Sequence, residues 1–215
     1  MRFMYFIVGD VHGCFHTLKK VLKAWDRTCE QLIFVGDYIN KGKHSKEVVQ
    51  LVRQLEREGA ICIMGNHEYQ MSQYIMQHTA FDDMKENYQY TIKHYDLKKK
   101  YRDDVHWMGH LPLYYKDARI FVSHAGVNFL GFRKFNKESS YSVLRYRGKL
   151  KRMKQLQVIG HTPVMQSKPK FDAKSNVLNI DTGAGNYQYL SAVRINHKGE
   201  VVETISKKIE KEDEI

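Results

Sequence analysis

The stretch GDYINKG, residues 36–42, follows directly on the apolar run LIFV at 32–35. A short apolar run that ends in glycine and aspartate is typical of a buried strand that opens into a tight loop. The same junction occurs at GDVHG, residues 9–13, and at GNHE, residues 65–68. Working outward from residue 36, we therefore expect three strands, each followed at once by polar side chains.

The segments between these strands are amphipathic. HTLKKVLKAW at 16–25 and SKEVVQLVRQLERE at 45–58 carry apolar residues at helical spacing. Strands that alternate with such helices predict a largely parallel sheet covered by helices. The polar and aromatic segment 69–107 predicts two or three helices that cover one end of the sheet.

The second half of the chain predicts further strands, which we expect to form a second sheet packed on the first. These segments are 118–127, 156–164, 176–185, 188–196 and 200–205. The predicted fold is therefore α/β, with a central two-sheet mixed β-sandwich flanked by helices. We expect one domain over 1–215, ending in a charged, solvated tail at 206–215.

Composition limits the partners. The net charge of +11 could attract nucleic acid, anionic membranes or phosphorylated substrates, so it does not choose among them. KKKYR at 98–102 is interpreted as a helix surface, and nucleic acid is not the expected partner. No apolar run reaches the length of a transmembrane helix, so no membrane partner is expected. Three cysteines, Cys14, Cys29 and Cys62, lack the spacing of a disulfide framework and favour a cytoplasmic location.

Five glycine-bounded motifs carry side chains that can bind metals: GDVHG, GDYINKG, GNHE, SHAG (123–126) and GHTP (160–163). Ligands of open α/β sheets collect beyond the carboxyl ends of the strands, so these loops can converge on one site. The candidate metal ligands are Asp10, His12, Asp37, Asn66, His124 and His161. This mixture of oxygen and nitrogen suits Mn, Fe, Zn or Co. Six ligands suit two ions, about 3.5–4 Å apart, that act on a phosphoryl group.

Taken in this order, the motifs resemble the binuclear metallophosphoesterases, and within them the phosphoprotein phosphatase branch, whose signatures are GDxHG, GDxVDRG, GNHE, HAG and GHT. The resemblance covers essentially the whole chain. The motif IDTGAG at 180–185 and the short length are more similar to bacterial and phage members, which include diadenosine tetraphosphate hydrolases. The resemblance implies the metallophosphoesterase fold.

The resemblance also implies roles for the ligands. Asp10 and His12 would hold one metal, Asp37 would bridge both, and the second metal would be held by Asn66, His124 and His161. A hydroxide that bridges the two metals would be the nucleophile. We expect two divalent transition-metal ions, with Mn favoured over Fe, Zn or Co.

Further residues are implied to handle the proton and the phosphate. His67 would be the general acid that protonates the leaving oxygen. The stretch VLRYRGK at 143–149 lies where the family has Leu-Trp-x-Arg, which makes Arg147 the phosphate-binding arginine and Arg145 its rival.

The sequence departs from the family at Asn40 and Lys41, where members usually carry Asp-Arg. The amide oxygen of Asn40 can accept a hydrogen bond from His67, but it brings no negative charge. Lys41 keeps a positive charge for the phosphate and loses the planar fork of a guanidinium.

These features predict a phosphatase that hydrolyses phosphomonoesters, with protein serine/threonine phosphate as the first choice of substrate. The alternative is a symmetrical bis(5'-nucleosyl)-tetraphosphate hydrolase, whose nucleoside pocket would come from the segment 69–117. A third possibility is a metal-binding regulator with weak catalysis. The expected partner is thus a phosphorylated protein or a small phosphoester, and the oligomeric state is open.

Replacing Asn40→Asp restores the negative charge beside His67 and favours the protonated form of that histidine. We expect this variant to act faster than the wild type on substrates with poor leaving groups. Rates on an alkyl phosphate and on an aryl phosphate test this, and an unchanged rate on the alkyl substrate would contradict it.

Overall fold

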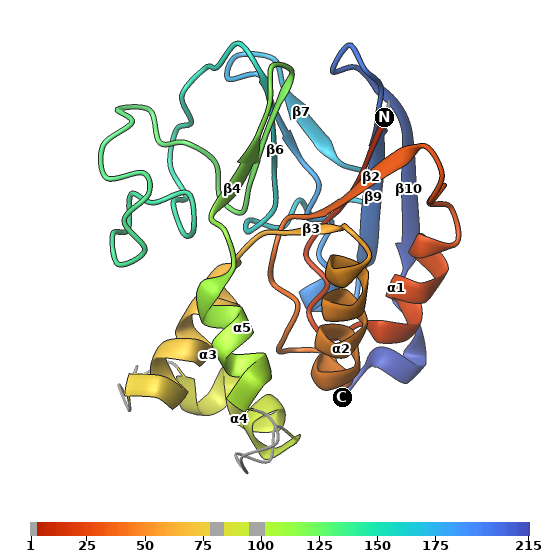
Figure 1. Cartoon of the computed structure of the whole chain (residues 1–215), viewed down its shortest axis with the longest axis vertical. Helices are drawn as coiled ribbons and strands as arrows, with labels where there is room; N and C mark the ends of the chain where they lie inside the picture. Colours follow the sequence, from red (N-terminus) through yellow and green to blue (C-terminus); the bar gives the residue numbers. More distant parts are fainter. Residues whose placement is uncertain (1–3, 78–83, 95–101) are drawn as a thin grey trace.

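The computed structural model describes residues 4–77, 84–94 and 102–215. Two five-stranded sheets pack face to face, with helices outside the first sheet and at one end of the molecule (Figure 1). The predicted mixed two-sheet sandwich with flanking helices is confirmed. Most of the basic stretch at 98–102 lies outside the described residues. Within the described ranges, no helix is both long and apolar enough to cross a membrane.

The first sheet has the strand order β10-β9-β1-β2-β3. Its strands are β1 (Met4–Val8), β2 (Glu30–Phe34), β3 (Ile61–Cys62), β9 (Tyr189–Ile195) and β10 (Val201–Lys208). β1, β2 and β3 are parallel, as the alternating strand and helix pattern predicts, and β9 and β10 are antiparallel.

The prediction that 188–196 and 200–205 belong to the second sheet is wrong. β9 pairs with β1, with Val8 opposite Ala192, so the central strand β1 has hydrogen-bonded partners on both sides. The apolar residues of β9 fit this place, because Val193 and Ile195 face the other sheet and Leu190 and Ala192 face the helices. When a strand is buried on both faces, its apolar sequence does not show which of the two sheets it joins.

The second sheet has the order β4-β5-β6-β8-β7. Its strands are β4 (Tyr114–Lys116), β5 (Ile120–Ser123), β6 (Leu156–Ile159), β8 (Val177–Asn179) and β7 (Lys170–Asp172). The edge strands β4 and β7 were not predicted. Each is three residues long, which is too short to show an alternating pattern.

Successive side chains of β1 and β2 point to opposite faces of the first sheet, so the core has two layers. Ile7 and Ile33 pack between the sheets against Val122 and Val158. Phe6 and its neighbours pack on the other face against the helices α1 (Phe15–Leu22) and α2 (Ser45–Arg57). Because both faces of the sheet are buried, the loops at its carboxyl edge are anchored to rigid strands.

Three helices cover one end of the molecule: α3 (Asn66–Gln77), α4 (Met84–His94) and α5 (Arg102–His110). The predicted two or three helices in this region are therefore confirmed. α3 starts directly in the GNHE motif, so the third metal-binding loop continues into a helix.

The last residues, 206–215, were predicted to be a solvated tail, and the structure corrects this. β10 continues to Lys208, and a short 3-10 helix, η3 (Lys211–Asp213), buries the carboxylate of Asp213 completely. That carboxylate accepts hydrogen bonds from the N–H groups of His16 and Thr17 and from the Thr17 hydroxyl, at 2.7–2.9 Å. It therefore caps the start of α1 from the far end of the chain.

Replacing Asp213→Asn leaves an amide group against these donors, so at least one N–H or hydroxyl loses its acceptor. We expect a loss of about 1–3 kcal/mol in the free energy of unfolding, the usual cost of an unsatisfied buried donor. Urea denaturation measures it. The exposed neighbour gives a matched control, Glu214→Gln, which should stay within about 0.5 kcal/mol of the wild type.

Candidate metal centre

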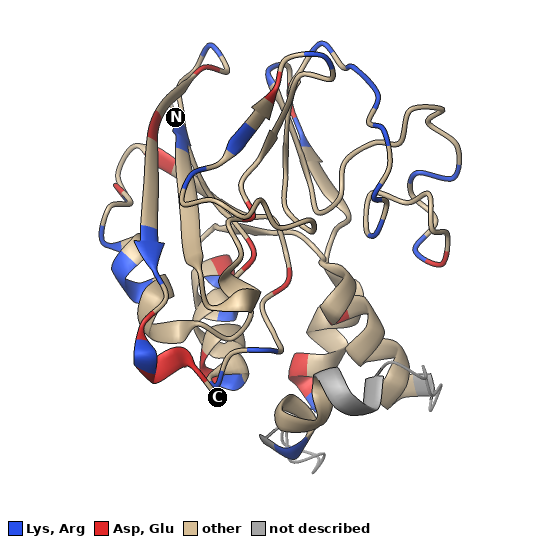
Figure 2. Ribbon diagram, turned by 180° about the vertical axis from the view of Figure 1, so that it is seen from behind, with Lys and Arg blue, Asp and Glu red and all other residues tan. Residues whose placement is uncertain are grey.

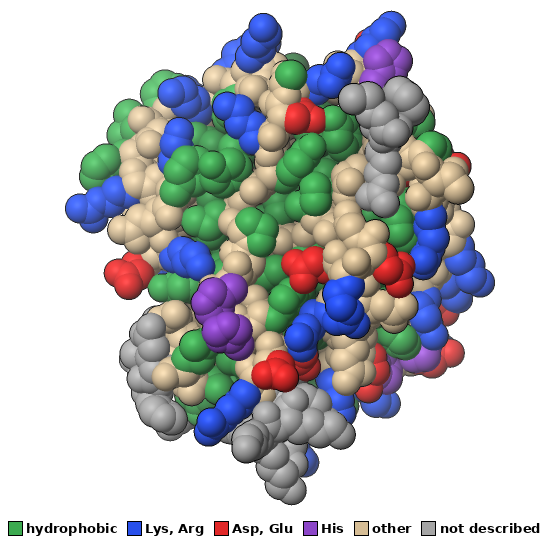
Figure 3. Space-filling view, viewed as in Figure 1, with side chains coloured by type: hydrophobic (Ala, Val, Ile, Leu, Met, Phe, Trp, Pro, Cys, Tyr) green, Lys and Arg blue, Asp and Glu red, His purple; other side chains and the backbone are tan. Residues whose placement is uncertain are grey.

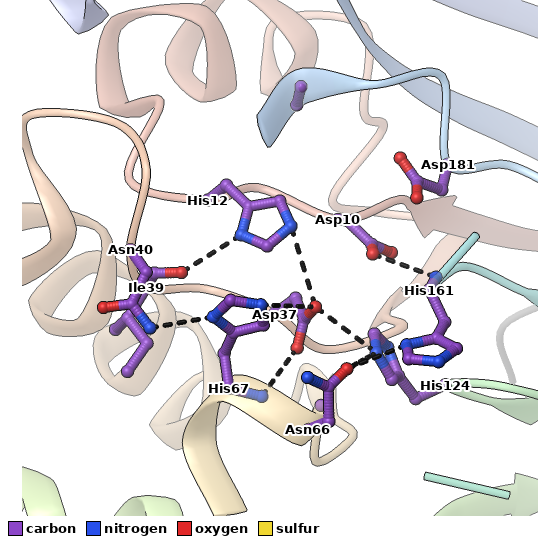
Figure 4. Close-up of polar contacts among 12 residues, drawn as sticks. Asp10, His12, Asp37, Ile39, Asn40, Asn66, His67, His124, His161 and Asp181 are labelled. Carbon is purple, nitrogen blue, oxygen red and sulfur yellow. Dashed lines mark hydrogen bonds and ion pairs between the residues drawn. The ribbon is translucent and has the colours of Figure 1, made fainter. Parts of the chain in front are cut away.

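The six predicted ligands come together at the carboxyl edges of the two sheets (Figure 4). Those on loops that follow β1, β2, β5 and β6 are almost completely buried, with exposed fractions between 0% and 7%: Asp10, His12, Asp37, His124 and His161. Asn66 stands at the first turn of α3. The prediction that loops far apart in sequence meet at one place is confirmed, and ligation by each of these side chains stays a prediction.

The loops around the centre adopt backbone conformations that side chains rarely take. The residues with left-handed φ values of 48–73° include His12, Asp37, Asn40, Lys41 and His161. Such a conformation costs roughly 1–3 kcal/mol per residue outside glycine and persists only where surrounding structure enforces it. Strain is thus concentrated in the loops that carry the candidate ligands.

One buried carboxylate, that of Glu68, enforces the conformation of the GDYINKG loop. It accepts hydrogen bonds from the N–H groups of Asp37 and Tyr38 at 2.8 Å, Gly65 at 3.0 Å and Ile39 at 3.3 Å. Burial, followed by the charge of Asp37, raises the pKa of Glu68 to about 7. The hydrogen-bonding capacity of Glu68 is thus used by backbone N–H groups, and these bonds hold Asp37 in place.

Three histidines each use one ring nitrogen to donate a hydrogen bond to a backbone carbonyl. Nδ1 of His12 lies 3.1 Å from the oxygen of Ile39, and Nδ1 of His124 lies 3.0 Å from that of Val35. Nε2 of His161 lies 3.1 Å from the carbonyl oxygen of Arg145. In a neutral imidazole the other nitrogen then carries a lone pair, as a metal ligand must.

These other ring nitrogens point at oxygen atoms. The Oδ2 atom of Asp37 lies 3.3 Å from Nε2 of His124 and 3.6 Å from Nε2 of His12. Oδ1 of Asn66 lies 3.0 Å from Nε2 of His124 and 2.8 Å from Nδ1 of His161. Acceptors that converge in this way repel one another unless a proton or a metal ion lies among them. Two such groups, His12 with Asp37 and His67, and Asp37 with His124 and His161, have geometry suited to a metal ion.

Asp10 has a free acceptor of the same kind. Its Oδ2 accepts a hydrogen bond from the N–H of His161 at 2.9 Å, whereas its buried Oδ1 has no partner. A Cβ atom on Gly160 would lie 1.8 Å from that Oδ1, so only glycine leaves this oxygen its space. A buried carboxylate oxygen without a hydrogen-bond partner is available to bind a metal ion. The donor set therefore fits a pair of divalent ions.

The pKa values follow the same electrostatics. Burial lowers the pKa of His12 to about 3 and that of His161 to about 2, so both are neutral and able to bind a metal. Burial also acts to lower the pKa of His124, but Asp37 and Asp10 outweigh it and raise the value to about 10. A protein-bound proton at His124 thus occupies the place where the carboxylates attract positive charge.

His67 faces the centre from the start of α3. Its Nε2 lies 3.8 Å from Oδ2 of Asp37, and its ring stacks on that of Tyr88 with centroids 5.3 Å apart. The Asn40 side chain contacts His67, as predicted, but its amide nitrogen rather than its oxygen lies 2.8 Å from Nδ1. The Asn40 amide oxygen is buried without a partner. Burial lowers the pKa of His67 to about 4.

Two cations border the cavity of about 180 Å³ above the ligands, namely Lys41 and Arg147. Arg145 is absent from this lining, because its guanidinium lies over the ring of Tyr69 at 5.3 Å. Arg145 contributes through its carbonyl group, which orients His161. Of the two arginines, Arg147 is therefore the one that lines this cavity, and phosphate binding by it stays a prediction.

Sequence reasoning did not single out Asp181, Tyr187 or Tyr88. Asp181 lines the cavity from the IDTGAG motif, and burial raises its pKa to about 6. The Tyr187 hydroxyl donates to the carbonyl of Lys41 at 2.6 Å and fixes the loop that carries it. The signal for Asp181 was the motif itself, in which an aspartate follows a buried strand. Nothing near the two tyrosines indicated a role.

Paired sheets with buried acceptors at their carboxyl edges and cations at the rim define a metal-dependent phosphoesterase. The chain belongs to the calcineurin-like phosphoesterase family, whose model matches residues 4–187. That family implies a binuclear metal centre, in agreement with the two clusters of His and Asp side chains that share Asp37.

Curated relatives extend the comparison. An asymmetrical bis(5'-nucleosyl)-tetraphosphatase of Anoxybacillus flavithermus is 28% identical over 89% of this chain and 90% of that protein. A symmetrical bis(5'-nucleosyl)-tetraphosphatase of Coxiella burnetii is 29% identical over 57% of this chain. The latter match spans only 41% of that relative's length.

Solved structures share the fold at low identity. The structure of a candidate diadenosine tetraphosphatase superposes with a TM-score of 0.72 at 21% identity, covering 98% of this chain and 96% of that one. A protein serine/threonine phosphatase from Saccharomyces cerevisiae gives 0.63 at 14% identity, covering 97% and 80%. These similarities establish the fold.

Because the Glu68 carboxylate accepts hydrogen bonds from four backbone N–H groups, replacing Glu68→Gln turns one acceptor oxygen into a donor that faces N–H groups. We expect the free energy of unfolding to fall by about 2–4 kcal/mol, since more than one buried donor loses its acceptor. Manganese affinity should fall as well, because Asp37 loses its support. Calorimetry of Mn binding and urea denaturation measure both. The exposed change Glu47→Gln is the control, and an unaltered Mn affinity in Glu68→Gln would contradict the prediction.

Proposed function

We propose that this protein hydrolyses the phosphate chain of dinucleoside polyphosphates, using a metal pair held by the six ligands listed above. The convergence of acceptor atoms on Asp37, beside the cations Lys41 and Arg147, is the observation that carries the proposal. Manganese is the ion that we propose for both positions, since oxygen and imidazole ligands without thiolate suit it.

The substrate class rests on a different observation. A relative that matches along nearly the whole length of both chains is an asymmetrical bis(5'-nucleosyl)-tetraphosphatase. The protein phosphatases among the solved structures are about 15% identical and speak for the fold alone. We therefore place the dinucleotide ahead of protein serine/threonine phosphate, which was the first expectation from the sequence.

Within the site, each residue has a defined task. Divalent ions in such a centre supply an activated water and offset the charge of the attacked phosphate. Lys41 and Arg147 attract and orient the remaining phosphate oxygens from the rim of the cavity. His67 presents Nε2 toward the same cavity, and we propose that it donates a proton to the leaving oxygen.

The residues around His67 orient its ring. Tyr88 stacks on one face of the ring, and Asn40 contacts Nδ1, so Nε2 is directed to the cavity. Neither supplies a negative charge. A polyphosphate leaving group is a good leaving group, so weak proton donation by His67 limits its cleavage less than that of an alkyl phosphate. This tolerance agrees with a dinucleotide substrate.

The test is a substrate panel with Mn-loaded protein: diadenosine tetraphosphate, a serine phosphopeptide and an aryl phosphate. We expect the highest kcat/KM for the dinucleotide. The variant Asp37→Asn, which removes the charge shared by both clusters, should lower that value by at least about a thousandfold. Highest kcat/KM for the phosphopeptide would replace our choice, and inactivity on all three would favour a metal-binding regulator.

A further inference from the structure

A groove of about 930 Å³ adjoins the metal-site cavity, and Arg147 and Pro163 line both. Its walls come from residues 146–152 between β5 and β6, from the loop 162–166 after β6, and from the β7–β8 hairpin. A ligand held at the metal centre can therefore continue past Arg147 into this groove. The described part of the segment 69–117, where we expected a nucleoside pocket, contributes nothing to its lining.

The groove is strongly basic. Its lining includes five cationic side chains, Arg147, Lys149, Arg152, Lys170 and Lys174, and one carboxylate, Asp172. Lys and Arg recur along this part of the ribbon in Figure 2. In the described part of the chain, none of the five cations forms an ion pair shorter than 4.0 Å. The groove thus offers free positive charge.

The lone carboxylate offsets one of these five charges and is engaged in the hairpin turn. Asp172 accepts hydrogen bonds from the N–H of Lys174 at 3.0 Å and from the hydroxyl of Ser175. Arg152 ties the same turn to the opposite wall by donating to the carbonyl oxygens of Ala173 at 2.6 Å and Lys174 at 3.1 Å. The turn that carries Lys174 is therefore fixed across the groove.

Apolar groups lie among the cations. Phe129 and Met165 line the groove with 52% and 69% of their surface exposed, and Tyr146 lies beside them. The Tyr146 ring packs so closely on Gly148 that a Cβ there would lie 2.4 Å from its hydroxyl oxygen. Over the segment between β5 and β6, the surface in Figure 3 shows hydrophobic side chains next to Lys and Arg. Aromatic side chains beside cations are suited to a base that carries phosphates, and here Nζ of Lys149 lies 4.6 Å from the centroid of the Phe129 ring.

We propose that this groove binds the leaving part of the substrate, a nucleoside with its chain of phosphates, while the cavity at the metal centre holds the phosphate that is attacked. The inference rests on the proposed function. A cavity of about 180 Å³ holds one phosphate group and not the whole dinucleotide, so the remainder lies outside it. The adjoining groove carries the charge and the aromatic faces that this remainder requires.

The occupied groove determines which bond breaks. The oxygen of water forms a bond to the phosphorus at the metal centre, and the bond from that phosphorus to the bridging oxygen breaks. The leaving group keeps the electron pair and takes up a proton. A leaving group with three phosphates matches the five cations of the groove better than one with two, so we expect diadenosine tetraphosphate to give ATP, released from the groove, and AMP.

The test compares the double variant Lys170→Ala/Lys174→Ala with a control of equal charge change, Lys198→Ala/Lys208→Ala, on the β9–β10 hairpin. We expect the ratio of kcat/KM for diadenosine tetraphosphate to that for an aryl phosphate to fall about tenfold in the groove variant. The control should keep the wild-type ratio. Lys170→Arg/Lys174→Arg should restore most of it, because the charge returns. An unchanged ratio in the groove variant, or ADP as the main product, would overturn the inference.

Inhibition separates this inference from the proposed function. Tripolyphosphate and ATP are used as inhibitors of aryl phosphate hydrolysis, at a fixed concentration of free Mn. Failure of the protein to cleave the dinucleotide would reject the proposed function. In that case the groove would still be supported as a polyphosphate site if the inhibition constant for ATP rises about tenfold in the groove variant. An equal constant in both proteins would reject the groove as a polyphosphate site.

Discussion

A buried carboxylate that faces imidazole lone pairs needs a cation to neutralise it, and Asp37 is placed in this way. His12 directs an acceptor nitrogen at its Oδ2, and Nε2 of His124 faces the same oxygen with the proton described above. Their other nitrogens are committed to backbone carbonyls, so the rings cannot turn a hydrogen toward Asp37 without gaining a proton. Without a metal ion, the proton on His124 supplies this positive charge, and divalent ions would replace it with a larger one.

Keeping these acceptors together requires rigid support. The left-handed conformations at His12, Asp37 and His161 are unfavourable by themselves, and β1, β2 and β6 hold the chain on one side of each loop. On the other side, Glu68 binds the N–H groups of the Asp37 loop. Burial of both sheet faces makes these supports hard to deform. Strain in the loops is thus offset by packing at a distance from the ions.

Sequence reasoning located the centre because its residues have both a recognisable chemical type and a local signal. Asp10 and His161 each follow an apolar run and lie next to glycine, which the fold then uses for close approach. Sequence reasoning misplaced β9, because a strand buried on both faces can join either sheet. It also treated Asp213 as part of a solvated tail, since its burial depends on meeting the start of α1 some 197 residues away in the chain. Contacts of that range leave no local pattern.

The cations of the groove lie outside the metal-binding motifs. They stand on residues 146–152 between β5 and β6 and on the β7–β8 hairpin, whereas the motifs SHAG and GHTP contribute uncharged residues to the lining. The two functions nevertheless meet in three consecutive residues. The carbonyl of Arg145 orients His161, Tyr146 lines the groove, and Arg147 lines both the groove and the metal cavity. The Arg145–His161 hydrogen bond thus joins the stretch that lines the groove to a candidate metal ligand.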